Sequence, residues 1–94
     1  MDAAFEWDAG KAESNLQKHG VSFDEAASVF FDMLSITISD PMHSVNEKRF
    51  VIIGLSRQHR HLVIVHTERD EKIRIISARP ATPGERKKYE SGIE

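Results

Sequence analysis

Residues 49–79 read RFVIIGLSRQHRHLVIVHTERDEKIRIISAR. Within this stretch the residues Arg49–Leu55, His61–Thr67 and Lys72–Arg79 form three β-branched runs of strand length. The breaks between the runs are long enough for hairpins but too short for the crossovers that parallel strands need. The stretch therefore predicts an antiparallel meander.

A further strand is predicted upstream of the meander. Residues 35–39 alternate polar and apolar side chains, as Ser-Ile-Thr-Ile-Ser, and Asp40-Pro41 follows as a turn signal. The sheet should thus contain three or four antiparallel strands.

A first helix is predicted before the strands, from an N-cap at Asp8 to His19, with Gly20 ending it. Helical periodicity places Ala12 and Leu16 toward the core. One polar stripe should then comprise Lys11, Asn15 and Lys18.

A second helix is predicted from the capping box Ser22–Glu25, in which Ser22 caps the amide of Glu25 and Glu25 reaches back. Val21 and Ala26 are spaced as a hydrophobic staple. The buried face of this helix should comprise Phe23, Ala26, Ala27 and Phe30.

A third helix is predicted from Thr82–Glu85, a second capping box with Pro83 at the first helical position. The predicted order is therefore two helices, an antiparallel sheet and a closing helix. This order defines an α+β fold, and residues 1–94 suffice for one domain with one core.

The composition excludes several classes of protein. There is no cysteine, which excludes disulfides, zinc–thiolate sites and thiol nucleophiles. The longest apolar run, residues 51–55, is interrupted by Gly54 and is far too short to cross a membrane. We expect a cytoplasmic protein that needs no cofactor and no membrane.

Charge is divided unevenly along the chain. Residues 1–46 hold two bases against eight acids, whereas residues 47–94 hold eleven bases against seven acids. A polyanion responds to the local patch, so the net charge of −2 neither proves nor excludes a nucleic-acid substrate.

Two strand ends carry candidate site residues. Arg79 precedes a helix N-terminus and suits a phosphate, although a surface ion pair is an equal alternative. Glu47 and Arg49 point the same way at the start of a strand and suit a general base beside a phosphate clamp. Spacing alone favours a cross-strand salt bridge for this pair.

Helix residues provide further candidates, each with a structural alternative. Lys18 and His19 end the first helix, where the helix dipole by itself explains a cation. Arg86 and Tyr89 lie one turn apart, and Tyr89 taken alone suits docking of the last helix. His59 and His61 lack the carboxylates that would complete a metal shell, so no metal site is predicted.

A set of motifs runs in order through nearly the whole chain: Phe5-Glu-Trp-Asp8, Lys11-Ala12, Asn15, Lys18-His-Gly-Val-Ser-Phe23, Glu25-Ala26, Glu47, Arg49, Arg74-Ile-Ile-Ser-Ala-Arg79, Ala81, Glu85, Arg86 and Tyr89. Taken together, these motifs resemble the BrnT toxin family. The chain departs from the family at residues 57–61, where Arg-Gln-His-Arg-His replaces a hairpin that usually contains glycine.

The resemblance implies a RelE-like ribonuclease toxin of a type II toxin–antitoxin system that inhibits translation. It also implies neutralisation by a BrnA-like antitoxin with a ribbon-helix-helix fold, with DNA bound only through the antitoxin complex. A non-catalytic module that binds a protein or a nucleic acid remains the alternative, and cleavage of RNA in EDTA by the purified protein would distinguish the two.

Metal-independent RNA cleavage requires a base, a proton donor and cations around the phosphorus. The sequence offers Glu47 or His19 as the base and Lys18 or Tyr89 as the donor. The candidate cations are Arg49, Arg74 and Arg79, while Lys11 and Arg86 are further candidates for substrate binding. Arg74 and Arg79 can serve one site only if their strand twists or bulges near Ser77, because a regular strand places them on opposite faces.

Overall fold

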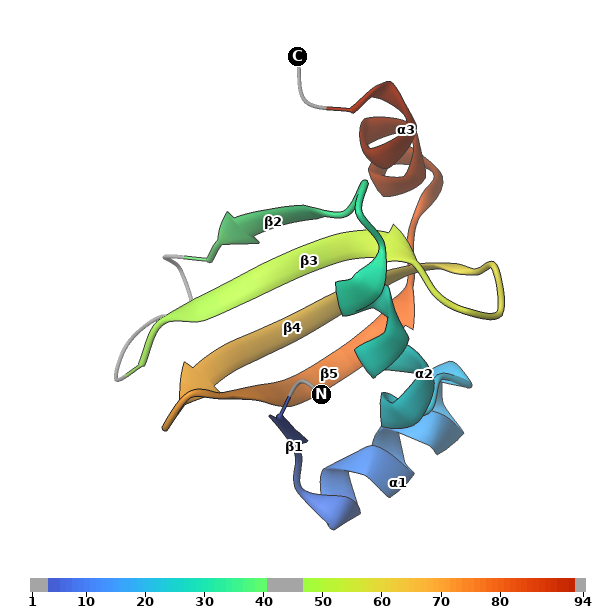
Figure 1. Cartoon of the computed structure of the whole chain (residues 1–94). Helices are drawn as coiled ribbons and strands as arrows, with labels where there is room; N and C mark the ends of the chain where they lie inside the picture. The colour runs from blue at the N-terminus through green and yellow to red at the C-terminus, as the bar shows by residue number, and fades with distance from the viewer. Residues whose placement is uncertain (1–3, 41–46, 93–94) are drawn as a thin grey trace.

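The computed structural model describes residues 4–40 and 47–92. The elements are, in chain order, β1 (Phe5–Glu6), α1 (Ala9–His19), α2 (Phe23–Ser28), the 3₁₀ turn η1 (Val29–Phe31), β2 (Ile36–Ser39), β3 (Arg49–Leu55), β4 (His61–Arg69), β5 (Lys72–Pro80) and α3 (Pro83–Ser91). The predicted α+β class is confirmed (Figure 1).

The strands form one five-stranded sheet in the order β1-β5-β4-β3-β2. The predicted meander is confirmed, since β2 to β5 pair antiparallel. The prediction of three or four strands was wrong, because β1 adds a parallel strand with Phe5 beside Ile73. Two residues are too few to show periodicity in the sequence, so only the pairing with β5 reveals this strand.

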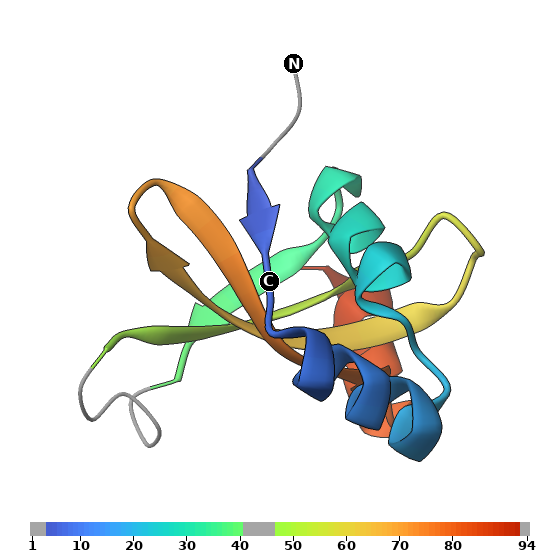
Figure 2. The ribbon, with the colours of Figure 1, turned by 90° about the horizontal axis from the view of Figure 1, so that it is seen from below.

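Helices α1 and α2 lie together on one side of the sheet, as Figures 1 and 2 show. The core between these helices and the sheet contains Val21, Phe23, Ala26, Val29, Ile52, Leu62, Ile64, Ile75 and Ala78. None of the helices in the described ranges is long and apolar enough to cross a membrane.

Local capping follows the predictions in most respects. Asp8 accepts a hydrogen bond from the amide of Lys11, and Gly20 ends α1 in the left-handed conformation with φ of 69°. The capping box of Thr82 and Glu85 is complete. The Ser22 box is only half formed, because Ser22 caps the Glu25 amide while the Glu25 carboxylate turns into the protein.

The predicted orientation of α1 was wrong at two positions. Leu16, expected in the core, is 50% exposed, whereas Asn15, expected on a solvated stripe, is 7% exposed. Asn15 is buried because its amide donates to the carbonyls of Val21 and Ala78 at 3.0 and 2.8 Å. A buried amide is tolerated only when it is hydrogen-bonded in this way.

The turn between β3 and β4 lacks glycine, and its backbone shows the consequence. His59 has φ of 64°, the left-handed conformation that glycine adopts without strain. The loop nevertheless closes, since the Ser56 amide donates to the Arg60 carbonyl at 2.9 Å and the His59 amide to the Ser56 carbonyl at 2.8 Å. Side-chain contacts to α2, described below, hold this turn in place.

His66 is a buried ionisable group on the helix-covered face of the sheet. Its ring stacks on Phe50 and meets Phe30 edge-on, with ring centroids 5.6 and 4.8 Å away. The side chain is buried, and among the described residues neither ring nitrogen has a hydrogen-bond partner. Burial lowers the pKa of His66 to about 4.

This burial predicts a loss of stability in mild acid. The unfolded chain takes up a proton on His66 near its ordinary pKa of 6.5, while the folded chain resists protonation until about pH 4. The free energy of unfolding should therefore fall by about 3 kcal/mol as pH drops through this window. Urea unfolding of the wild type and of His66→Leu between pH 7.5 and 4 measures this change. In the variant, the free energy of unfolding should depend on pH much less than in the wild type.

The exposed His59 supplies the control for this prediction. His59→Asn keeps a residue that tolerates positive φ, so it should retain the full pH dependence. A His66→Leu protein with the wild-type pH dependence would contradict the assignment to His66.

Candidate functional site

One face of the sheet carries the arginines that the sequence singled out. Leu62 and Ile64 point into the core beneath the helices, so Val63, Val65 and Thr67 point to the opposite face. Residues paired across antiparallel strands share a face. The partners on β3 and β5 complete this second face, which we call the arginine face: Arg49, Val51, Ile53, Arg74, Ser77 and Arg79.

A bulge in β5 decides which of its residues join the arginine face. The pairing of β5 with β4 shifts by one residue between Val65 and His66, which leaves Ile76 without a register partner. Arg74 and Arg79 are five positions apart and would face opposite ways in a regular strand. The extra residue returns both to one face, so the geometric condition for a shared site is met.

Arg79 lies at one end of the arginine face and pairs with Glu85 of α3. Its two terminal nitrogens donate to the two Glu85 oxygens, both at 2.8 Å. The hydrogen bonds from Arg79 are the main reason that the pKa of Glu85 falls to about 2. The Arg79 side chain is still 41% exposed, so a phosphate can reach it in exchange for Glu85.

Arg49 and Arg74 lie at the other end of this face, on either side of Thr67. Arg74 Nη1 is 3.4 Å from Glu6 Oε2 on β1. The β4 partners of Arg79 and Arg74 are Val63 and Thr67, four positions apart, so the two ends are about 13 Å from each other along the strand. One phosphate cannot contact both ends.

Glu47 forms a salt bridge across the strands, with Arg69 rather than with Arg49. Arg69 Nη2 lies 3.1 Å from Glu47 Oε1, and Glu47 precedes β3 at the same end of the sheet as Arg49. The carboxylate is therefore held by β4 and stands apart from Arg79.

Helix α1 covers the outer edge of β5 through Asn15. The Asn15 Nδ2 donates to the Ala78 carbonyl, and the Ala78 amide donates to Asn15 Oδ1 at 3.1 Å. These backbone groups of Ala78 point away from β4, so the Asn15 amide takes the place of a neighbouring strand.

Two basic residues of α1 flank the contact between Asn15 and Ala78. Lys11 and Lys18 lie one turn before and one turn after Asn15 on the same side of the helix, and both are exposed. Since β1 runs parallel to β5 and leads into α1, the C-terminal end of α1 lies toward the end of β5. Lys18 and His19 therefore lie toward the same end of β5 as Arg79, but on the helix that packs against the opposite face of the sheet.

Tyr89 docks α3 onto the rest of the fold. Its hydroxyl donates to Asp32 Oδ2 at 2.7 Å, and its ring meets His61 edge-on at 5.2 Å. Burial and the Asp32 hydrogen bond raise the pKa of Tyr89 to about 12. This hydroxyl is poorly suited to release a proton.

Arg86 lies on α3 one turn before Tyr89 but has a different environment. Its Nε donates to Glu90 at 3.0 Å, and both side chains are more than half exposed. The two residues are thus not brought together in one site.

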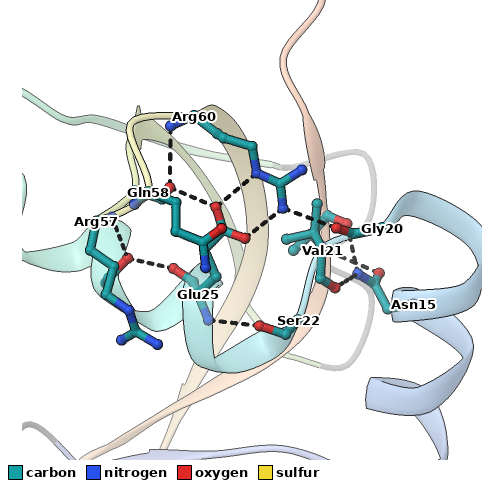
Figure 3. A network of polar contacts seen from close by, with 11 residues as sticks. Asn15, Gly20, Val21, Ser22, Glu25, Arg57, Gln58 and Arg60 are labelled. Atoms are coloured by element: carbon teal, nitrogen blue, oxygen red, sulfur yellow. Dashed lines mark hydrogen bonds and ion pairs between the residues drawn. The ribbon is translucent and has the colours of Figure 1, made fainter.

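A second polar cluster, drawn in Figure 3, was not predicted from the sequence. Glu25 is 2% exposed and accepts hydrogen bonds from Ser56 Oγ at 2.7 Å and Arg60 Nε at 2.9 Å. Arg60 also donates to the carbonyl of Gly20 at 2.9 Å. The hydrogen bond from Arg60 is the largest cause of the lowered pKa of Glu25.

The role of this cluster is to join three segments. Glu25 belongs to α2, Gly20 caps α1, and Arg60 ends the β3–β4 turn. The one sequence signal for this cluster was the β3–β4 turn without glycine. Arg60 of this turn binds Glu25 and so holds the turn against the helices.

No group of three or more histidine, aspartate or glutamate side chains that could hold a metal is found within residues 4–40 and 47–92.

The fold and the site define a class: a small α+β protein whose sheet presents one arginine-bearing face between a helix-covered edge and a C-terminal helix. The family model described as "Ribonuclease toxin, BrnT, of type II toxin-antitoxin system" matches residues 7–85, and the chain belongs to this family. No curated protein matches the chain.

A solved structure supports the same fold. The crystal structure of the Brucella abortus ribonuclease toxin BrnT superposes with a TM-score of 0.67 at 18% identity, covering 86% of this chain and 99% of that chain. At this identity the likeness concerns the fold alone.

Proposed function

We propose that this chain is an endoribonuclease toxin that cleaves RNA on the arginine face without a metal ion and so inhibits translation. The observation that carries the proposal is the bulge at Ile76, which aligns Arg74 and Arg79 on one face together with Arg49. Such an array of guanidinium groups suits the phosphates of a nucleic-acid strand.

The bond-breaking step is assigned to the Arg79 end of this face. The ribose 2′-hydroxyl attacks its own phosphodiester, which yields a 2′,3′-cyclic phosphate and a free 5′-hydroxyl. Arg79 stabilises the added negative charge on the phosphoryl oxygens, His19 accepts the proton of the 2′-hydroxyl and Lys18 protonates the leaving 5′-oxygen. Tyr89 is a poor donor because Asp32 holds its proton.

The remaining cations bind the rest of the strand. Arg49 and Arg74, about 13 Å from Arg79, hold flanking phosphates, and Lys11 extends the basic border along the β5 edge. Glu47 is paired with Arg69 at the far end and takes no part in the step. A BrnA-like ribbon-helix-helix antitoxin would neutralise the enzyme, and DNA would be bound only through that complex.

The test is cleavage of single-stranded RNA by the purified, partner-free protein in EDTA. We expect products with 2′,3′-cyclic phosphate ends and no cleavage of the matching DNA, which lacks the attacking hydroxyl. Induction in cells should stop translation and growth, and co-expression of the antitoxin should restore both. Folded protein that leaves RNA intact would favour a non-catalytic binding module instead.

A further inference from the structure

A row of side chains crosses the middle of the arginine face. Its members, each paired with the next across β2, β3, β4 and β5, are Ile38, Val51, Val65 and Ser77. Residues paired in this way share a face, so all four lie on the side of the sheet opposite α1 and α2. We call these four residues the middle row. It offers a hydroxyl at β5 and an apolar surface from β4 to β2.

The middle row is open to solvent. Ile38 is 50% exposed, and the other three members are partly exposed. In the next row on the same face, Ile53 and Val63 are only 5% and 2% exposed. A ligand that lies across this face can therefore reach the middle row.

The Ser77 hydroxyl is available to such a ligand. Within residues 4–40 and 47–92 this hydroxyl makes no hydrogen bond, although it can donate one and accept two. It stands between two cations of β5, because the bulge at Ile76 leaves Arg74 and Arg79 on the same face as Ser77. An uncharged donor between two guanidinium groups suits an anionic oxygen in the middle position.

The spacing of Arg74, Ser77 and Arg79 matches the repeat of a nucleic-acid backbone. Their partners are every second residue of β4: Thr67, Val65 and Val63. Successive donors are thus about 6.7 Å apart along the strand. One nucleotide spans the same number of backbone bonds as two amino-acid residues, so successive phosphates of an extended nucleic-acid strand are separated by a similar distance.

We propose that the arginine face takes a single RNA strand whose consecutive phosphates lie on Arg79, Ser77 and Arg74, with the scissile phosphate at Arg79. The bases extend across the sheet toward β2 and lie on the apolar part of the middle row. This requires unpaired bases, because the faces of a base in a duplex are covered by its neighbours in the stack. The inference rests on the proposed binding of RNA to this face and adds Ser77 to its contacts.

The test measures binding of short 2′-fluoro RNA strands, which lack the attacking 2′-hydroxyl, with one, two or three phosphates. Ser77→Ala should weaken binding of the two longer strands about 10-fold, since a hydrogen bond to a charged group is lost. The strand with one phosphate should bind Ser77→Ala like the wild type, because an arginine holds that phosphate. Arg74→Ala should weaken only the strand with three phosphates, also about 10-fold.

Salt dependence separates the two kinds of contact. For a single strand, each cation lost from a phosphate lowers the slope of log affinity against log salt concentration by about 0.7. Arg74→Ala should show this decrease with the strand of three phosphates. Ser77→Ala removes no charge, so its binding should be weaker at every salt concentration with an unchanged slope.

Ser77→Thr and Ser39→Ala are the matched controls. Ser77→Thr keeps a hydroxyl and a residue that suits a strand, so it should bind like the wild type. Ser39 pairs with Phe50, which stacks on His66 on the helix-covered side, so the loss of its hydroxyl should not affect binding. All these variants should melt like the wild type, because each replaces a side chain that is at least partly exposed.

Several results would overturn the proposal. They are wild-type affinity of Ser77→Ala for the strand with three phosphates, an equal loss in Ser39→Ala, and an equal loss for the strand with one phosphate. A fully paired RNA hairpin should compete at least 10-fold more weakly than an unpaired strand with as many phosphates. Equal competition by the hairpin, or a wild type that binds none of the strands, would also contradict it.

Cleavage of ordinary RNA by the same proteins separates this inference from the proposed function. If the wild type cleaves RNA but the expected binding pattern is absent, the ribonuclease stands and the positions assigned to the phosphates are wrong. If no variant, wild type included, cleaves RNA, the ribonuclease proposal fails while the binding pattern still decides this inference.

Discussion

Arg79→Ala should lower the rate of RNA cleavage by about 10²–10³-fold, or about 3–4 kcal/mol, because the guanidinium acts on charge that develops in the transition state. The fold should survive the change. The ion pair with Glu85 is partly exposed and contributes at most about 1 kcal/mol. The Thr82 hydroxyl still accepts from the Glu85 amide, so α3 keeps its cap. Arg79→Lys should also be slow, since an ammonium cannot reproduce the planar fork.

Single-turnover cleavage of a short RNA measures this effect, with Arg57→Ala as the control. Arg57 is exposed on the β3–β4 turn, where its amide donates to Ser28 of α2 on the helix-covered side of the sheet, and its loss should leave the rate unchanged. Full activity in Arg79→Ala would remove Arg79 from the site. An unfolded Arg79→Ala protein would show that the residue serves stability instead.

Arg60→Met should lower the free energy of unfolding by about 3 kcal/mol, because it leaves the buried carboxylate of Glu25 without its charged partner. The Gly20 carbonyl loses a donor in the same step. For a small domain whose total stability is about 5–15 kcal/mol, this loss is large. Urea unfolding at pH 7 measures it directly.

The pH dependence identifies the cause of this destabilisation. In the wild type the pKa of Glu25 lies below its ordinary value of 4.5. The ionised carboxylate therefore raises the free energy of unfolding at pH values above 4.5. Without Arg60 the carboxylate is protonated more readily, so the stability gap between variant and wild type should narrow as pH falls below 4.5. Glu25→Gln combined with Arg60→Met should recover part of the loss, while Arg57→Met should change stability by less than about 0.5 kcal/mol. A gap that stays constant with pH would point to lost packing alone.

Most of the secondary structure could be predicted because its signals are local. The caps of α1 and α3 depend on residues three or four positions apart, and Gly20 ends α1 as expected. The strands of the meander match their β-branched runs to within about two residues, which is the usual uncertainty at element ends. The family was also recognisable, because ordered motifs do not require knowledge of contacts.

The site was predictable only as a set of residue types. Arg49, Arg74 and Arg79 were selected as cations, and the need for a bulge between the last two was foreseeable from strand alternation. The ion pairs were not foreseeable. Arg79 pairs with Glu85, Arg74 with Glu6 and Arg69 with Glu47. The catalytic roles assigned to Lys18 and His19 remain predictions.

The sequence by itself determined the order of helices and strands and the family, since capping, periodicity and motifs act over a few neighbouring residues. Only the tertiary structure decided that Asn15 is buried against Ala78, 63 positions away, and that Glu25 meets Arg60, 35 positions away. It also decided, through the pairing of β4 with β5, that Ile76 bulges and that two arginines share a face. These outcomes depend on which groups are removed from water together when distant segments pack. A buried polar group then needs a hydrogen-bond partner, and that partner can belong to any segment that the fold brings close.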